Sequence, residues 1–232
     1  MLEFINVSND LDLKECFNVR YQVFTLEQGY DKAIDIDKYD QMSKHILVRD
    51  NGKAIGCLRY YLIDNYYKIG RVCILKEYRN KGFAKELIYR VINDIEFNTD
   101  IRLIKLSSQV LAKEFYLKCN FKTIGDEYLE EGTLHILMEY NLDSLIHYRY
   151  LLDLIDPKIK ELLLSRLDII KKIALYKANN KIPILDTNRE EYIIDKYTKN
   201  IKDDKLDYYI LLLKDIIKVS KLYQNDIINK NL

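Results

Sequence analysis

The sequence predicts a domain of alternating strands and helices over residues 1–141, followed by an all-helical domain over residues 142–232. Short β-branched apolar runs separated by polar turns recur through the first part, which is typical of strands. From residue 133 to the end there is no glycine, and apolar residues recur at helical spacing. A content of 48% hydrophobic and 31% charged residues is that of a soluble globular protein.

The elements of the first domain are short and are bounded by turn and capping residues. Ser8, Asn9 and Asp10 are residue types that cap a helix start. Asn51-Gly52 predicts a tight hairpin, because both residues accept the positive φ angles that such a turn needs. The expected strands cover residues 2–7, 45–49, 54–63, 68–75, 101–107, 121–128 and 133–140, and the expected helices cover 9–25, 84–95 and 109–119.

The stretch 68–95 organises the first domain as strand, polar turn and amphipathic helix. At the start of a helix, backbone N–H groups have no partner inside the helix, and the helix dipole favours negative charge. Arg79 and Lys81 add two cations beside these groups. An ordinary helix start with two solvated cations would show the same pattern, but the setting between a strand and a helix favours an anion site. The predicted pyrophosphate cradle consists of Arg79, Asn80, Lys81, Gly82, Phe83 and Ala84.

The pattern Arg79-x-x-Gly82-x-Ala84 resembles the acetyl-CoA-binding motif of the GNAT superfamily of N-acetyltransferases. Further segments resemble the ElaA-like branch of that superfamily, and together they extend the resemblance over about residues 1–141. They are R-x-x-V-F-x-x-E-Q from Arg20, D-x-x-D-x-x-x-x-H from Asp37, G-x-x-R from Gly56, I-G-R-V from Ile69 and Q-x-x-A-x-x-F-Y from Gln109.

The resemblance implies an α/β (α+β) fold with a mixed, mostly antiparallel central sheet flanked by helices. It also implies transfer of the acetyl group of acetyl-CoA, as cosubstrate, to a primary amine by direct attack in a ternary complex. The pantetheine arm would lie along Val72, Cys73 and Ile74, and the N–H of Ile74 would polarise the thioester carbonyl. Gln109, where the family usually has Asn, is expected to contribute to the coenzyme site.

Tyr116 occupies the position of the family's general acid, although a packed aromatic residue is the alternative among 20 tyrosines. A phenol with a pKa of ~10 can protonate a departing thiolate. The general base is less determined. Glu27 and His45 lead, followed by Asp40 and His135, and each of them could instead be structural.

Other charged and sulfur-containing residues have two interpretations as well. The three arginines in the resembling segments could bind an acidic acceptor, or they could pair with nearby aspartates and lock the strands, which is the favoured interpretation. Cys73 could form an acyl intermediate, but a buried strand thiol is the commoner case. The arginines are Arg20, Arg59 and Arg71, and the aspartates are Asp35, Asp37 and Asp40.

The net charge, the length of the apolar runs and the numbers of cysteines and histidines argue against several classes of protein. A net charge of +1 argues against nucleic acid and membrane partners, and no apolar run reaches the ~20 residues of a membrane span. Four scattered cysteines and three histidines predict reduced thiols, no metal site and a cytoplasmic location, and the N-terminus has no signal-peptide layout.

Two alternative functions remain open from the sequence. One is a non-catalytic acyl-CoA sensor that signals through the helical domain. The other is transfer of a longer acyl chain, as in acyl-homoserine lactone synthases. The sequence does not identify the acceptor, a small molecule or a peptide bearing an amine, nor the role of the helical domain. It leaves the oligomeric state open, with a homodimer as one option.

Overall fold

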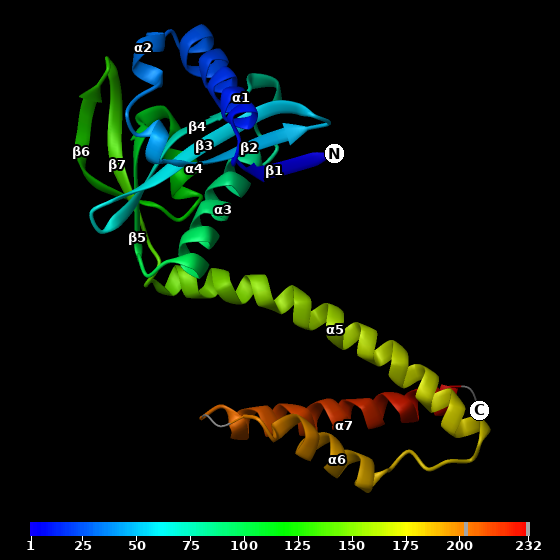
Figure 1. Cartoon of the computed structure of the whole chain (residues 1–232). Helices are drawn as coiled ribbons and strands as arrows, with labels where there is room; N and C mark the ends of the chain where they lie inside the picture. The colour runs from blue at the N-terminus through cyan, green and yellow to red at the C-terminus, as the bar shows by residue number, and fades with distance from the viewer. Residues whose placement is uncertain (202–203, 231–232) are drawn as a thin grey trace. The chain divides into compact units, whose positions relative to one another are not determined.

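The computed structural model describes residues 1–201 and 204–230. The chain divides into two compact units, Met1–Tyr150 and Leu151–Leu232, which we describe separately (Figure 1). Within the described ranges, no helix has the length and apolar character needed to span a membrane.

The first unit is built on a seven-stranded sheet with the strand order β1-β2-β3-β4-β5-β7-β6. Every neighbouring pair is antiparallel except β4 and β5, which run parallel. The mixed, mostly antiparallel sheet predicted above is therefore confirmed. The strands are β1 (Leu2–Asn6), β2 (Lys44–Asp50), β3 (Lys53–Ile63), β4 (Tyr66–Ile74), β5 (Leu103–Gln109), β6 (Lys122–Glu130) and β7 (Thr133–Asn141).

Helices cover both faces of this sheet (Figure 1). α3 (Phe83–Asn98) buries its apolar stripe, from Leu87 to Ile95, in the larger core cluster. α1 (Asp10–Arg20) contributes Cys16 and Val19 to a second cluster on the other face. Asn9 caps α1 by accepting a hydrogen bond from the backbone N–H of Asp12, as its residue type predicts.

Two predicted helices differ from the structure in their hydrogen-bond pattern. The helix expected over residues 9–25 continues from α1 into a π-helical segment, Tyr21–Glu27. The helix expected over residues 109–119 is a 3-10 turn, Val110–Ala112, followed by the short α4 (Lys113–Leu117). Apolar spacing does not distinguish these helix types, because it reports which face is buried and not which carbonyl accepts each N–H. Between the π-helical segment and β2, the chain forms α2 (Lys32–Asp35) and a 3-10 turn, Asp40–Met42.

The two parallel strands separate before they end. Their pairing runs only from Tyr67 opposite Ile104 to Ile69 opposite Leu106, although β4 and β5 both continue beyond it. Arg71 has a φ angle of 53°, a left-handed conformation that is unusual for a non-glycine residue inside a strand. The register between β3 and β4 shifts at the same level. This bulge turns β4 away from β5 and opens a wedge in the sheet.

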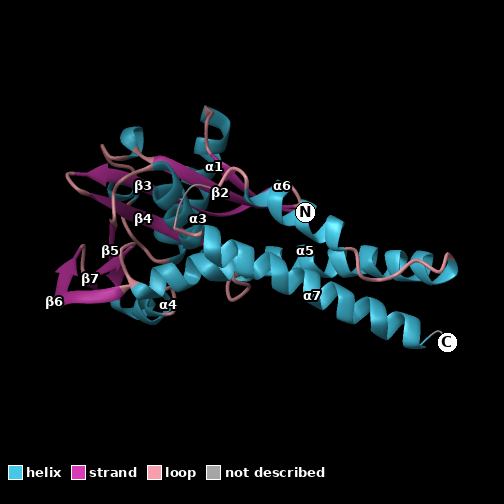
Figure 2. Cartoon of the chain, turned by 90° about the horizontal axis from the view of Figure 1, so that it is seen from below, coloured by secondary structure: helices cyan, strands magenta, loops and turns pink. Residues whose placement is uncertain are grey.

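The second unit is entirely helical, as predicted (Figure 2). It contains most of α5 (Leu145–Asn179), together with α6 (Thr187–Thr198) and α7 (Leu206–Lys230). Pro157, a residue type that usually favours the first turn of a helix, lies inside α5. A proline removes one N–H donor but has a helical φ angle, and helix formers on both sides continue the helix. The buried apolar residues of the unit include Ile170 and Ala174 on α5, and Leu213 and Ile217 on α7.

Candidate functional site

A cavity of about 480 Å³ lies where β4 and β5 separate, a volume in the range of small-molecule sites. Ile69 to Val72 form one wall, and Leu106 to Gln109 form the other. Tyr116 and His135 also line it, together with several residues of the segment that follows α1. The remaining lining residues are Phe24, Gln28, Tyr30, Ile34, Asp35, Asp37, Tyr39, Arg59, Tyr61, Lys68, Ala112, Glu130 and Glu131.

The edge of β4 that faces this wedge has no partner strand beyond Ile69. On the opposite edge, the N–H of Leu75 donates to the carbonyl of Ile55 on β3. Because N–H directions alternate along a strand, the N–H of Ile74 points to the wedge side. Val72, Cys73 and Ile74, which were predicted to bind the pantetheine arm, therefore occupy a strand segment with one open edge.

The turn between β4 and α3 has the geometry of an anion-binding loop. Asn80 and Gly82 both have left-handed φ angles, 61° and 86°. Gly82 is the N-cap of α3 and no side chain caps that end, so the first N–H groups of the helix remain available. Successive N–H groups in such a turn converge on one point. A Cβ atom at Gly82 would meet nothing within 4 Å, so the φ angle is what favours glycine there.

Arg79 and Glu27 form an ion pair beside this turn. The Nη1 and Nη2 atoms of Arg79 donate to the two carboxylate oxygens of Glu27 over 2.7 and 2.6 Å. The hydrogen bond from Arg79, together with its charge, lowers the pKa of Glu27. Glu27 is not among the residues that line the cavity. A carboxylate that is paired and made more acidic in this way is poorly suited to be the general base.

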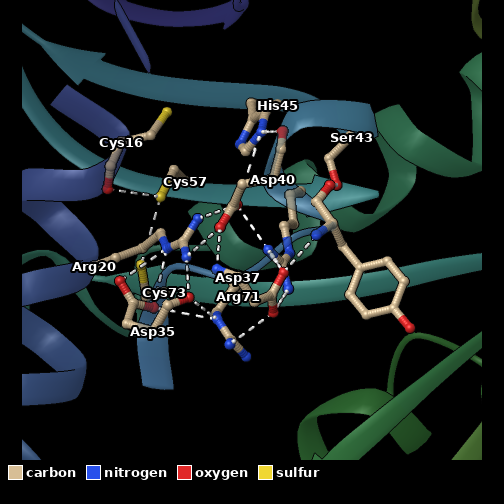
Figure 3. Close-up of polar contacts among 12 residues, drawn as sticks. Cys16, Arg20, Asp35, Asp37, Asp40, Ser43, His45, Cys57, Arg71 and Cys73 are labelled. Carbon is tan, nitrogen blue, oxygen red and sulfur yellow. Dashed lines mark hydrogen bonds and ion pairs between the residues drawn. The ribbon is translucent and has the colours of Figure 1, made fainter. Parts of the chain in front are cut away.

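A buried network of arginines and aspartates lies next to the cavity (Figure 3). Arg20 is only 1% exposed, and its Nε lies 3.1 Å from a carboxylate oxygen of Asp35. Its Nη1 lies 2.6 Å from Asp40. Charges buried to this extent need such partners, because an unpaired buried charge is strongly destabilising.

Arg59 and Arg71 extend the same network towards the cavity. Arg59 donates to both carboxylate oxygens of Asp37, over 2.8 and 2.5 Å, and lies 2.7 Å from Asp40. Arg71 lies 3.2 Å from Asp35 and from Asp37. The pairing interpretation of the three arginines therefore agrees with the structure. The network holds the segment after α1 against β3 and β4.

His45 and Asp40, two of the base candidates, belong to this network. His45 is buried, its Nε2 lies 3.1 Å from the backbone oxygen of Asp40, and burial lowers the pKa of its imidazole. Burial alone would raise the pKa of Asp40, but hydrogen bonds and charge from Arg20, with a further hydrogen bond from Arg59, lower it to about 2. Neither residue lines the cavity. Their position is that of structural groups that connect β2 to the loop before it.

Tyr116, in contrast, lines the cavity. Its side chain is 8% exposed, and its ring packs against Phe115 and Phe121 at centroid distances of 4.9 and 6.0 Å. Burial raises the pKa of its phenol, with smaller contributions from two thiols and none from a hydrogen bond. The hydroxyl therefore stays protonated at neutral pH and can donate to a ligand.

Gln109 lines the cavity but is engaged by the opposite wall. Its Nε2 donates to the hydroxyl of Tyr30 over 3.0 Å and to the side-chain oxygen of Gln28 over 3.2 Å. Tyr30 in turn donates to the hydroxyl of Thr133 over 2.6 Å. These bonds tie the segment after α1 to β5 and β7 across the cavity. No motif indicated Tyr30 or Thr133, because they come from segments far apart in the sequence that only the fold brings together.

Cys73 lies in a group of buried thiols that also contains Cys16 and Cys57 (Figure 3). The sulfur atoms of Cys57 and Cys73 are 3.6 Å apart on neighbouring strands. Hydrogen bonding to Cys16 and Cys73, together with burial, raises the pKa of the Cys57 thiol. Cys73 is only 4% exposed, so its surroundings fit the interpretation as a packed strand thiol.

The helical unit holds a separate buried polar cluster. Arg166 on α5 donates to the hydroxyl of Ser220 on α7, and burial lowers the pKa of Arg166. Ser220 and Gln224 are 4% and 6% exposed. The side-chain oxygen of Gln224 is buried and has no hydrogen-bond partner among the described residues. A buried acceptor without a partner is unusual in a helical core.

No group of three or more His, Cys, Asp or Glu side chains within residues 1–201 and 204–230 is arranged to hold a metal ion.

Comparison with known proteins gives different results for the two parts of the chain. Residues 10–142 match the family described as acetyltransferase (GNAT) domain, and residues 148–225 match the family described as chorismate mutase type II. The uncharacterised N-acetyltransferase YjcF of Bacillus subtilis is 30% identical over 138 residues, which cover 59% of this chain and 98% of YjcF.

Two further proteins are each similar to one part of this chain. The crystal structure of Escherichia coli ElaA, at 24% identity, covers 61% of this chain and all of ElaA with a TM-score of 0.55, which shows the shared fold. The chorismate mutase of Methanocaldococcus jannaschii is 32% identical over 96 residues, or 39% of this chain and 97% of that enzyme. The helical region, in which sequence motifs indicated no function, thus has a family of its own.

Proposed function

The chain belongs to the GNAT acetyltransferase family, and from this premise we propose that its first unit transfers the acetyl group of acetyl-CoA to a primary amine. The observation that carries the proposal is the cavity at the separation of β4 and β5. It is bordered by Tyr116 and by the segment of β4 that has no partner strand on that side, and β4 leads directly into the turn before α3.

The coenzyme would lie along β4 and the turn before α3 in an extended form. The amides of its pantetheine arm pair with the open edge of β4, as an added strand would. Its diphosphate binds the N–H groups of the turn around Gly82, with Lys81 as the nearby cation, because the charge of Arg79 is already balanced by Glu27. The N–H of Ile74 points to the wedge and donates to the acetyl oxygen as negative charge develops there.

The reaction is a direct displacement. The amine nitrogen forms a bond to the acetyl carbon, the carbon–sulfur bond breaks, and the sulfur leaves with the electron pair. Tyr116 gives its proton to this thiolate, and the attacking nitrogen loses a proton to a base. Because burial raises the pKa of Tyr116, the phenol keeps its proton until the strongly basic thiolate appears.

A binding experiment tests the coenzyme site. We expect acetyl-CoA to raise the melting temperature of the full chain, since a ligand at 100 times its Kd stabilises by about 2.7 kcal/mol. Gly82→Glu should abolish the increase, because it puts a carboxylate at the diphosphate site. Gly125→Glu is the matched control, since Gly125 also has a positive φ angle and open space but lies on β6 outside the cavity. Unchanged affinity in Gly82→Glu would refute the proposed coenzyme site.

A turnover experiment separates the enzyme from a non-catalytic sensor. Purified chain, acetyl-CoA and a panel of primary amines are mixed, and the release of free thiol is followed. Release that depends on one class of amine supports transfer and identifies the acceptor. Binding of acetyl-CoA without release for any amine would support the sensor instead.

The C-terminal region belongs to the chorismate mutase type II family, and we propose that it isomerises chorismate. The buried cluster of Arg166, Ser220 and Gln224 supports this second function. Chorismate carries two carboxylates, which a guanidinium binds well, and a hydroxyl group that can donate to the free oxygen of Gln224. A helical unit that only stabilised its neighbour would have no need of an unsatisfied buried acceptor.

Loss of the ultraviolet absorbance of chorismate measures this activity in the full chain. Arg166→Gln should lower the rate by about 100-fold or more, the usual cost of removing one electrostatic contact in a site. Lys172→Gln is the matched control, since Lys172 is exposed on the same helix. Full activity in Arg166→Gln, or no conversion of chorismate by the unmodified chain, would contradict the assignment.

A further inference from the structure

His135 is the one base candidate that lines the cavity between β4 and β5. It lies on β7, opposite Gln109 of β5 and Tyr128 of β6, and its side chain is 12% exposed. The chain has two other histidines. His45 is part of the buried ion network, and His147 is fully buried between the hydroxyl of Tyr140 and the carboxylate of Glu96.

The hydrogen bond of His135 fixes the position of its proton. Its Nδ1 lies 2.9 Å from the backbone oxygen of Thr133. A carbonyl oxygen can only accept, so Nδ1 must carry the hydrogen in the neutral ring. Nε2 then holds the lone pair and can accept a proton. Thr133 itself is held in place by the hydroxyl of Tyr30.

A carboxylate lies close to the ring of His135. An oxygen of Glu130 lies 3.9 Å from Nδ1 of His135, and the same oxygen accepts a hydrogen bond from Ser107 over 2.8 Å. The hydroxyl of Ser107 is also 2.6 Å from that of Tyr128. The titratable groups that face His135 are therefore Glu130 and Tyr128 on β6, with Tyr30 behind Thr133.

We propose that Nε2 of His135 accepts the proton that the acceptor amine loses during acetyl transfer. This inference rests on the proposed acetyltransferase function and adds the catalytic residue that completes it. The proton moves from the amine nitrogen to Nε2, while the proton of Tyr116 moves to the leaving thiolate. His135 and Tyr116 thus carry the two proton transfers from different elements that line one cavity.

Nitrogen NMR tests the arrangement of His135 without an acceptor. With only three histidines, the ring signals of the full chain are assigned by comparison with a His135→Asn variant. We expect the neutral ring of His135 to carry its hydrogen on Nδ1, and acetyl-CoA to shift its Nε2 signal. A neutral ring with its hydrogen on Nε2 would overturn the proposal, and so would an Nε2 signal that is unaffected by saturating acetyl-CoA.

Kinetics with an amine that gives turnover test the role itself. Asn at position 135 keeps a donor for the Thr133 carbonyl but has no basic nitrogen. His135→Asn should lower kcat by ~10²–10⁴-fold, leave the Kd of acetyl-CoA unchanged, and remove the fall of kcat/KM at low pH. Glu139→Gln, on the same strand but outside the cavity, should match the unmodified chain.

The outcomes separate this inference from the proposed function. Transfer that proceeds normally in His135→Asn, with the low-pH fall retained, would overturn the role of His135 and leave the acetyltransferase intact. Binding of acetyl-CoA without transfer to any amine would overturn the function and this role with it.

Discussion

Arg79 holds Glu27 through two parallel hydrogen bonds, so the turn before α3 is fastened to the end of the π-helical segment that follows α1. The Nε of Arg79 also donates to the carbonyl of Ile74, over 2.9 Å, at the end of β4. One side chain therefore links the open strand edge, the anion-binding turn and the first helical segment. From this geometry we propose that Glu27 positions the turn and does not act as the base.

Replacement of Glu27 tests this role. In Glu27→Gln we expect a loss of stability of at most about 1 kcal/mol, because both side chains of the pair are about a third exposed. The dependence of kcat/KM on pH should keep its shape. Urea unfolding and the free-thiol assay measure the two effects, with Glu77→Gln, from the exposed pair with Lys53, as the control. If kcat/KM of Glu27→Gln no longer falls at low pH, Glu27 is the general base after all.

Replacement of Tyr116 tests the general acid. Tyr116→Phe removes a hydroxyl that has no hydrogen-bond partner among the described residues and keeps the packing of the ring on Phe115 and Phe121. We expect kcat to fall by ~10²–10⁴-fold, with unchanged acetyl-CoA binding and melting temperature. In the unmodified chain, no loss of activity from this phenol should appear up to about pH 10, because burial raises its pKa above the usual value. An equal kcat for Tyr116→Phe and the unmodified chain would exclude Tyr116 as the general acid.

The buried ion network predicts a loss of stability in acid. The pKa of Asp40 is about 2 in the folded chain, against ~3.9 for an unfolded aspartate. A lowered carboxyl pKa contributes stability that is fully present above the unfolded value and is lost as the pH falls through the folded value. Urea unfolding should therefore show stability falling between about pH 4 and pH 2.

The same network predicts the effect of removing the carboxylate. Asp40→Asn leaves Arg20 and Arg59 with less compensation in a buried setting, which costs about 3–5 kcal/mol. Asp64→Asn, at an exposed turn with a positive φ angle that Asn also accepts, is the control. If both variants unfold at the same urea concentration at pH 7, the network is not a source of stability.

Close packing of β3 against β4 makes Gly56 sensitive to a methyl group. A Cβ atom there would lie 2.2 Å from the Cδ1 of Ile74 and 3.0 Å from the carbonyl oxygen of Cys73. Gly56→Ala should therefore cost about 1–3 kcal/mol, the usual cost of overpacking, and should weaken acetyl-CoA binding by displacing the strand that holds it.

Gly70→Ala is the matched control for this packing. Its Cβ would have only one ordinary contact, at 3.9 Å from Arg59, and Gly70 has no positive φ angle. Thermal unfolding without ligand compares the two variants, and the stabilisation by acetyl-CoA is compared between Gly56→Ala and the unmodified chain, because Gly70 itself lines the cavity. Equal melting temperatures for the two would show that Ile74 moves aside without cost.

The elements and the turn before α3 were accessible from the sequence because their signals are local. Alternation and helical spacing identified the seven strands and the stripe of α3, and the Arg79–Ala84 pattern identified the turn. The sequence left the general base open among Glu27, His45, Asp40 and His135. Glu27 and His45 have suitable side chains, but their partners, Arg79 and Asp40, are set by contacts between distant segments. The polar cluster of the helical region was not predicted, because Arg166 and Ser220 are 54 positions apart.

The order of the residues is enough to show which faces of the strands and helices are apolar, where turns fall, and that Tyr116 lies in a register typical of an acetyltransferase. The pairing of charged groups and the lining of the cavity become visible once the chain is folded, because both depend on neighbours from distant segments. The separation of β4 from β5, the pairing of Glu27 with Arg79, and the single free ring nitrogen of His135 beside the cavity all arise from contacts between residues far apart in the chain.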